Sequence, residues 1–382
     1  MAIDTRPKAG LEDVVAGESS ICYLDGARGV LAYHGYDVHD LAHAERGASF
    51  EEVCHLLWHG RLPTRAELGD LQTQLAAARA LPEPLVRAMR SLPRVDGMDA
   101  LRTLVSIAAH YDPDAGEASA AANYRKAVRL TGQLASIVAT WGRMAQGGGA
   151  IDPDPALGHA ANFLYLLTGQ RPSGLAARAF DVSLVLHADH ELNASTFAAR
   201  VAAATLTDLH SAIVGAIGTL KGPLHGGANA AVMKMLLDIG RDAGGERAEQ
   251  WVRAKLARKE KIAGFGHRVY RTEDPRATHL RRFSKLLGDT TGEPQWFEMS
   301  QRIEQLVRAE KSLHPNVDFY SASTFHSLGI PIDLYTPIFA VSRISGWTAH
   351  VLEQYANNRL IRPRTDYIGP QYPQTFLPVE QR

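Results

Sequence analysis

Apolar residues recur at every third or fourth position over long stretches of this chain, and no other feature constrains its fold as strongly. The clearest series are Leu206, Leu209, Ile213, Ile217 and Leu220; Leu68, Leu71, Leu75 and Ala78; and Ile344, Trp347 and Val351. This spacing places the apolar side chains on one face of an α-helix. The sequence therefore predicts a mainly α-helical protein.

Only one segment has the pattern of β-strands. Between Ile21 and Tyr33, two short apolar runs flank Asp25-Gly26, a pair of residues that favours a tight turn. We expect a small β-hairpin near the N-terminus.

Length and charge limit the kind of protein this is. The chain has 382 residues, enough for two domains, and 41 Lys and Arg residues balance 41 Asp and Glu residues. A balanced charge gives no indication of a nucleic-acid partner. No apolar stretch is long enough to cross a membrane, and the N-terminal residues lack the apolar core of a signal peptide, so we expect a cytoplasmic protein. Cys22 and Cys54 are expected to be reduced thiols.

Two histidines lie in a turn-rich segment, 187–196. His187 and His190 are three residues apart, so both could lie on one face of a helix. We interpret the segment as a helix end with satisfied polar groups. A metal site that uses His187, His190 and Glu191 is the alternative. The spacing is not that of a His-Glu-x-x-His zinc site, and we expect no metal.

A third histidine, His225, lies in the glycine-rich segment 221–229, which separates two helical patterns. We expect the next helix to begin near Ala230 and to place His225 beside its N-terminus. There the positive end of the helix dipole would keep the imidazole neutral. The alternative is a histidine in a surface turn.

Segment 261–270 contains Gly264, Gly266 and His267. It lacks the third glycine of a dinucleotide-binding motif and follows a charged helix rather than a strand, which excludes a Rossmann site. Further along, Asp318 lies between apolar and aromatic residues. Such surroundings should raise the pKa of its carboxyl and make it a better base.

Six segments, in the same order along the chain, resemble the signature motifs of citrate synthases. They are HADHELNAST, GPLHGGAN, GFGHRVY with DPRA, PNVDFYS, SRISGWTAH and RLIRPR. The resemblance extends from about Cys22 to Tyr367 and is greatest to the shorter bacterial and archaeal enzymes. It implies a helical homodimer of two-domain subunits, with a large domain at 1–225 and 325–382 and a small domain at 226–324.

The resemblance also implies a role for each motif residue in condensing acetyl-CoA with oxaloacetate and water, the Si-type acyltransferase reaction that gives citrate. Asp318 would remove a proton from the acetyl methyl group, and His225 would donate a hydrogen bond to the thioester oxygen. His267 would polarise the keto group of oxaloacetate. The residues expected to bind its carboxylates are His190, Arg276, Arg343 and Arg362, with Arg362 contributed to the partner's site.

Coenzyme A would be a substrate, and no cofactor is implied. Its expected contacts are Lys261, Ile262, Ala263, Gly264 and Phe265, with Arg271 as a further candidate for a phosphate. The main alternative is a 2-methylcitrate synthase, which uses propionyl-CoA, although HADH, GHRVY and DFY favour acetyl-CoA. Alternatives from other classes are a metal-dependent hydrolase and a helical scaffold without catalytic activity.

Overall fold

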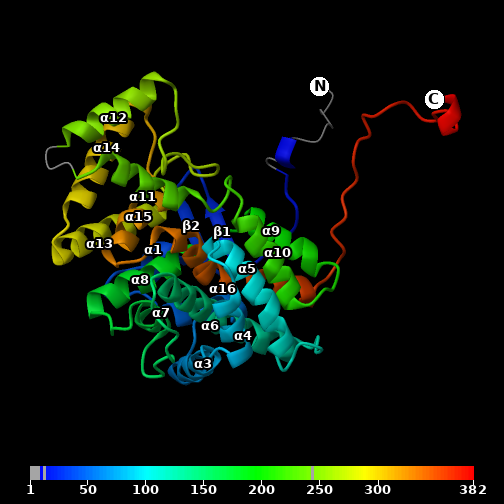
Figure 1. Cartoon of the computed structure of the whole chain (residues 1–382), viewed down its shortest axis with the longest axis horizontal. Coiled ribbons are helices and arrows are strands. Elements are labelled where there is room, and N and C mark those ends of the chain that lie inside the picture. The colour runs from blue at the N-terminus through cyan, green and yellow to red at the C-terminus, as the bar shows by residue number, and fades with distance from the viewer. Residues whose placement is uncertain (1–8, 12–13, 242–244) are drawn as a thin grey trace.

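The computed structural model describes residues 9–11, 14–241 and 245–382. Figure 1 shows a helical body and, leaving it, an extended C-terminal segment that follows α16 (Tyr335–Ala356). The mainly α-helical fold class predicted from the apolar spacing is confirmed.

The N-terminal hairpin is present. Strands β1 (Cys22–Asp25) and β2 (Val30–Tyr33) pair antiparallel, with Cys22 opposite Tyr33. A third strand that the sequence did not predict, β3 (Tyr36–Asp37), pairs with β2. The turn of the hairpin lies against segment 269–272: the N–H of Arg271 donates to the carbonyl of Gly26 at 2.8 Å.

The helices of the first half and of the C-terminal part form the larger group. Their bounds are α1 Val38–Leu41, α2 Phe50–His59, α3 Arg65–Ala78, α4 Glu83–Ser91, α5 Gly97–Ala108, α6 Ala120–Ala145, α7 His159–Thr168, α8 Gly174–His187, α9 Ala194–Ala203, α10 Leu209–Leu220 and α16 Tyr335–Ala356. Short 3-10 turns lie at Ala9–Leu11, Ala109–Tyr111, Ile332–Leu334 and Val379–Gln381.

Helix α16 is the central element of this group. It packs on α2, α5, α6, α8, α9 and α10. Ile344, Trp347 and Val351 are fully buried on it, as their spacing predicts. The helix is buried on nearly every side because other helices surround it, and it therefore needs apolar residues all round.

A second group consists of α11 (Ala228–Ile239), α12 (Glu246–Ala257), α13 (Pro275–Thr291), α14 (Gln295–Lys311) and α15 (Val317–Ser327). These helices pack chiefly on one another, α13 against α15 and α12 against α14, and they lie together at the upper left of Figure 1. The expected end of the small domain, Thr324, lies inside α15, three residues before that helix ends.

Three local expectations can be compared with the structure. Leu206 was placed on the helix that contains Leu209, but it precedes α10, has a positive φ of 63° and is 69% exposed. Cys22 and Cys54 are free thiols, as expected. Among the described residues, no helix combines the length and apolar character that a membrane crossing requires.

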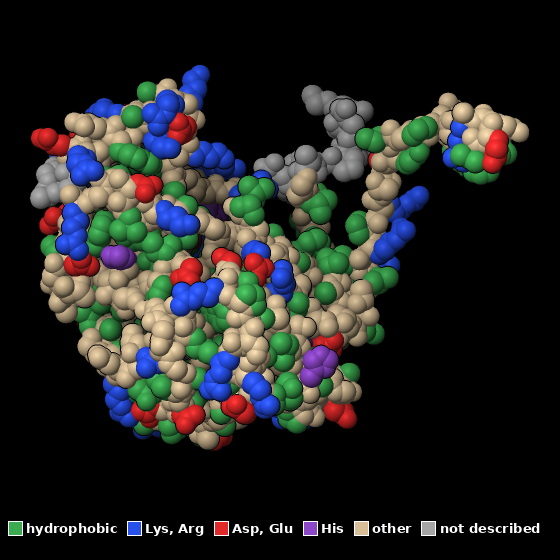
Figure 2. All heavy atoms as spheres, viewed as in Figure 1, with side chains coloured by type: hydrophobic (Ala, Val, Ile, Leu, Met, Phe, Trp, Pro, Cys, Tyr) green, Lys and Arg blue, Asp and Glu red, His purple; other side chains and the backbone are tan. Residues whose placement is uncertain are grey.

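The C-terminal segment 357–382 is extended and carries exposed apolar side chains. Tyr367, Ile368, Tyr372 and Phe376 are each at least 70% exposed. Figure 2 shows hydrophobic side chains along this segment, whereas positive and negative side chains are intermixed over the body.

Candidate functional site

Six of the residues singled out in the sequence interact in the structure: His190, His225, His267, Arg276, Asp318 and Arg343. We call this set the histidine site. The rings of His190 and His267 are 5.4 Å apart between centroids, and the charge of Arg343 lowers the pKa of both His190 and His225. Burial raises the pKa of Asp318, and Asp318 is close enough to Arg276 for that charge to oppose the rise. The fold thus brings together residues from five separate segments.

His190 lies in the turn between α8 and α9. Helix α8 ends at His187, so the two histidines do not share a helical face, and that prediction was wrong. The ring of His187 is buried, with Nδ1 2.7 Å from the carbonyl of Ser183. His190 Nε2 instead lies 3.2 Å from the hydroxyl of Tyr270. Within the described ranges, no three His, Cys, Asp or Glu side chains are grouped as metal ligands.

His267 has a defined tautomer. Its Nδ1 accepts hydrogen bonds from the backbone N–H groups of Val269 at 3.0 Å and Tyr270 at 3.1 Å. An accepting nitrogen carries no proton, so we assign the ring proton to Nε2. Burial, together with the charge of Arg276, lowers the pKa of His267 to about 4. At neutral pH this residue is an uncharged hydrogen-bond donor.

His225 is also held as a neutral ring, and its hydrogen-bond partner in the structure lies on α9. Its Nε2 lies 2.8 Å from Ser195 Oγ and accepts from the backbone N–H of Ser195 at 3.3 Å. Ser195 is in the first turn of α9, whereas α11 begins at Ala228, three residues after His225. We therefore assign the ring proton to Nδ1. Burial and the charge of Arg343 lower the pKa of His225 to about 4.

Arg276 is oriented by a carboxylate that sequence analysis did not single out. Asp274 caps the N-terminus of α13 and binds the guanidinium of Arg276 through two bonds of 2.9 and 2.8 Å. The same carboxylate accepts from the N–H of Val317 at 3.0 Å and thus joins the starts of α13 and α15. The signal in the sequence was Asp274-Pro275, because Asp before Pro is typical of a helix start.

Arg343 lies inside the molecule with part of its hydrogen-bonding capacity unused. Its Nε donates to the carbonyl of His187 at 2.8 Å, and its guanidinium stacks on Phe339 at 4.8 Å. The side chain is 1% exposed, yet Nη2 is buried without a hydrogen-bond partner among the described residues. A buried cation with free donors is costly unless an anion binds it. Arg343 therefore indicates an anion-binding position.

Asp318 is the second residue of α15. Its backbone N–H donates to Asn316, the N-cap residue, and its carboxyl lies among buried neighbours. Burial raises the pKa of Asp318 to about 6, despite the opposing charge of Arg276. The direction of this shift confirms the prediction made from the apolar and aromatic residues around Asp318.

The segment expected to bind CoA forms a bridge to the start of α15. Phe265 pairs with Pro315, and the N–H of Asn316 donates to the carbonyl of Gly264 at 2.9 Å. Gly264 has a positive φ of 81°, and a Cβ on it would be 2.8 Å from the ring of Phe319. Lys261 and the side chain of Arg271 are exposed. Ile262 is buried and Ala263 half-buried.

Arg362 is the predicted site residue that the fold does not bring to the others. It is exposed, in the extended C-terminal segment that leaves the body in Figure 1.

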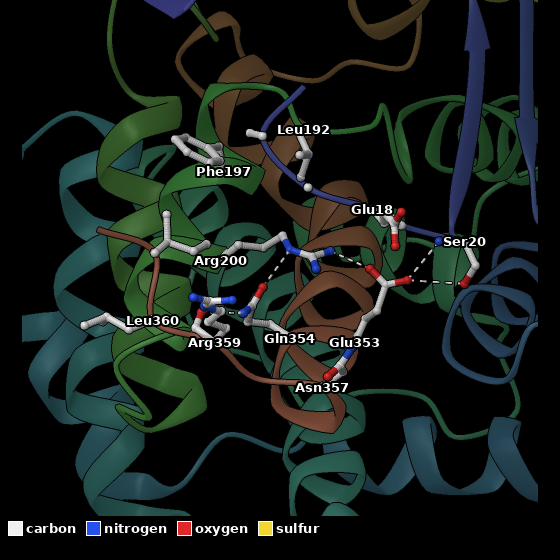
Figure 3. A pocket seen from close by; sticks show the side chains of 14 residues that line it. Glu18, Ser20, Leu192, Phe197, Arg200, Glu353, Gln354, Asn357, Arg359 and Leu360 are labelled. Atoms are coloured by element: carbon white, nitrogen blue, oxygen red, sulfur yellow. Dashed lines mark hydrogen bonds and ion pairs between the residues drawn. The ribbon is translucent and has the colours of Figure 1, made fainter. Parts of the chain in front are cut away.

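A cavity of about 640 Å³ lies between α9, the end of α16 and residues 16–20, and none of the six residues of the histidine site is among those that line it (Figure 3). Leu192 and Phe197 line it, two residues beyond His190 and Ser195 respectively. Arg200, which pairs with Glu353, lies across from Ser20, and Ser20 also donates to Glu353. The start of the C-terminal segment, Arg359 to Ile361, forms part of the wall.

Two further polar residues position the site and were not assigned roles from the sequence. Ser195 Oγ accepts from Trp347 Nε1 at 3.1 Å, which links α9, α16 and His225. The hydroxyl of Tyr270 lies against His190 and its ring under Arg276, at 5.9 Å. Both residues were within the recognised motifs, but only the packed structure shows which atoms they contact.

Comparison with known proteins shows the family to which this chain is similar. The family model "Citrate synthase, C-terminal domain" matches residues 10–364. Citrate synthase 2 of Bacillus subtilis is 54% identical over 98% of both chains, and a 2-methylcitrate synthase of Shewanella oneidensis is 43% identical over 98% of both.

Solved structures resemble the fold over nearly its whole length. Citrate synthase from Pyrobaculum aerophilum superposes with a TM-score of 0.90 at 42% identity, covering 98% of this chain and 95% of that one. Citrate synthase from Thermoplasma acidophilum, solved as a ternary complex with carboxymethyl coenzyme A and oxaloacetate, gives 0.89 at 32% identity and covers 98% and 99%.

Proposed function

Because the chain belongs to the citrate synthase family of condensing acyltransferases, we propose that it joins acetyl-CoA to oxaloacetate and hydrolyses the product to citrate and CoA. The observation that carries this proposal is the histidine site, where two neutral imidazole donors and a carboxyl of raised pKa lie beside two buried guanidiniums.

The first step is removal of a proton from the acetyl methyl group by the carboxylate of Asp318. Such a proton is far less acidic than a carboxylic acid, so the enolate needs stabilisation as it forms. The Nδ1–H of His225 would donate to the thioester oxygen and supply it. Because the ring is neutral, this donor is present throughout the physiological pH range.

The second step forms the carbon–carbon bond. The enol carbon attacks the keto carbon of oxaloacetate, and the Nε2–H of His267 polarises the keto oxygen and donates to it as charge develops. Water then cleaves the thioester of the product and releases CoA. Arg276 and the free Nη2 of Arg343 would bind the carboxylates of oxaloacetate, with His190 completing the contacts.

The ternary complex of the Thermoplasma relative supports these two substrates. The expected CoA contacts from Lys261 to Phe265 are part of the proposal, with Arg271 exposed nearby for a phosphate. We include no metal and no further cofactor, since the proton abstraction and the carbon–carbon bond formation are both assigned to side chains of the protein.

We further propose that a second copy of the chain completes the site. Arg362 lies in an extended segment with exposed apolar side chains, which favours its packing on another molecule. In a twofold dimer, each chain would contribute Arg362 to the oxaloacetate site of the other.

The test is an assay of free thiol released from acetyl-CoA with and without oxaloacetate. We expect release only when both are present, with citrate formed in equal amount. Release without oxaloacetate would indicate a thioester hydrolase and contradict the proposal.

The second candidate is 2-methylcitrate synthase, favoured by the 43% identity to the Shewanella enzyme. The same assay run with propionyl-CoA distinguishes the two. One additional methylene changes binding by only about 1–3 kcal/mol, so we expect activity with both thioesters and a higher kcat/KM for acetyl-CoA.

A further inference from the structure

A second cavity, of about 210 Å³, lies between α3, α4 and α6, at the end of the molecule opposite α12 in Figure 1. Its buried polar lining consists of Arg79, Ser136 and Thr140, which are 2%, 1% and 4% exposed. Apolar side chains, among them Leu81, Val86, Ile151 and Leu166, form much of the remaining wall. None of these residues belongs to the histidine site.

Arg79 is a buried guanidinium with most of its donors unused. Nη1 donates to the carbonyl of Leu157 at 2.6 Å. Nε is buried without a partner, and over the described ranges the guanidinium makes no other hydrogen bond or ion pair. Glu51 interacts with Arg79 electrostatically but does not form an ion pair with it. The edge formed by Nε and Nη2 is therefore free.

Two residues with hydroxyl groups, Ser136 and Thr140, line the same cavity as Arg79. Ser136 and Thr140 are four residues apart on α6 and so lie on the same helical face. Ser136 Oγ is buried and has no hydrogen-bond partner among the described residues, and the Thr140 hydroxyl likewise makes no hydrogen bond with them. Buried polar groups are rarely left unpaired, so a ligand or water is expected to satisfy them.

The shape and charge of the cavity indicate which ligand fits. A free Nε/Nη2 edge binds a carboxylate through two parallel hydrogen bonds, and the hydroxyls can donate to the same anion. Glu83, Asp152 and Arg90 line the cavity as exposed residues, and Glu83 lies 3.6 Å from Arg90. The acidic groups are thus on its solvent side, and the unpaired cation is at its buried side.

We propose that this cavity binds a short aliphatic carboxylate, whose carboxylate group pairs with Arg79 and whose chain lies against the apolar wall. The volume limits the chain to a few carbons. The site is separate from the proposed catalytic centre and does not depend on it.

Butyrate is the probe, measured by calorimetry and by the rise in melting temperature, with butyramide as the uncharged analogue. We expect saturable binding of one butyrate per chain at millimolar concentrations and no binding of butyramide. Arg79→Met should weaken binding at least tenfold, because it removes the paired charge. Thr140→Val should weaken it by a factor of roughly five.

The matched control is Thr131→Val on the same helix, since Thr131 Oγ1 is already bonded to the carbonyl of Ala127 at 2.8 Å. It should leave butyrate binding unchanged. If Arg79→Met does not fold, Thr140→Val keeps Arg79 in place and still tests the site.

Carboxylates could also bind at the histidine site, so Arg343→Met is included. Binding that disappears in Arg343→Met and persists in Arg79→Met and Thr140→Val would place butyrate at the histidine site and overturn the proposal. So would a wild-type chain that binds no butyrate, in which case water alone would fill the cavity.

Discussion

Asp318 is the residue on which the proposed chemistry depends most directly. Asp318→Ala should lower kcat by roughly 10²–10⁴-fold, because the substitution removes the proposed general base. Oxaloacetate should still bind and raise the melting temperature, since other side chains hold it. Thiol-release kinetics and thermal unfolding measure the two effects.

The control for this variant is Asp208→Ala. Asp208 caps α10 through Ser211, so its loss should cost about 1 kcal/mol of stability and leave kcat unchanged. An Asp318→Ala protein that condenses at the wild-type rate would exclude the assigned base.

The pH dependence follows from the same carboxyl group. Burial raises the pKa of Asp318 to about 6, and the base is its ionised form. As pH falls through about 6, the active fraction is lost, so kcat/KM should fall about tenfold per pH unit below that value. His225 and His267, with pKa values of about 4, stay neutral over this range. A flat profile from pH 7 to pH 5 would contradict the role of Asp318.

Arg343 tests whether the free guanidinium binds the keto acid. Arg343→Lys should raise the KM for oxaloacetate at least tenfold, because a single ammonium cannot reproduce the planar pair of donors. Arg178→Lys is the control: Arg178 is already paired with Asp181 at 2.7 Å, and its loss should leave this KM unaltered. Equal KM values for the Arg343→Lys and wild-type proteins would contradict the assignment of Arg343 to oxaloacetate binding.

At the scale of elements, the contact between the hairpin and segment 269–272 can be broken by one methyl group. A Cβ on Gly26 would lie 2.2 Å from the carbonyl oxygen of Val269. Gly26→Ala should therefore push the β1–β2 turn off the segment that follows His267 and lower both melting temperature and kcat. In Gly69→Ala, on α3, the new Cβ meets nothing within 4 Å, and the protein should be stabilised by about 0.5–1 kcal/mol.

The sequence predicted helices and strands well wherever one periodic face is buried. Ile213 and Ile217 on α10 are fully buried as their spacing indicates, whereas Leu206 shares the spacing but lies outside the helix. Asp208, the N-cap residue of α10, explains the difference, because its side chain accepts from Ser211 and starts the helix after Leu206. The capping residue thus sets where the helix begins, which the apolar periodicity alone does not show.

The sequence predicted which residues belong to the site, but it did not predict which residues form hydrogen bonds with them. The motifs identified His225 and its neutral state, yet the helix that contacts it is α9, which starts 31 residues before His225 in the chain. Local sequence could not reveal this, because the contact depends on how α9 and α16 pack. Asp274 and Ser195 were overlooked for the same reason, since each acts by joining distant segments.

At the scale of the whole molecule, the shared site can be tested by complementation. Chains carrying Asp318→Ala and chains carrying Arg362→Ala, each inactive alone, are unfolded together in equal amounts and refolded. Half of the resulting dimers should be mixed, and each mixed dimer has one site with both residues intact. About a quarter of the wild-type site density should return. Mixed dimers without any activity would show that Arg362 serves its own chain.

The extended C-terminal segment also determines how the protein would lose activity during digestion by a protease. Exposed chain with few contacts to its own body is the first part that a protease reaches. A cut before Arg362 would leave the helical body folded, so the melting temperature would hardly change. If Arg362 completes the partner's site, as proposed above, the cut would inactivate the partner's site and leave the cut chain's own site active. Activity during digestion should therefore decline in direct proportion to the number of intact tails, while the protein remains folded.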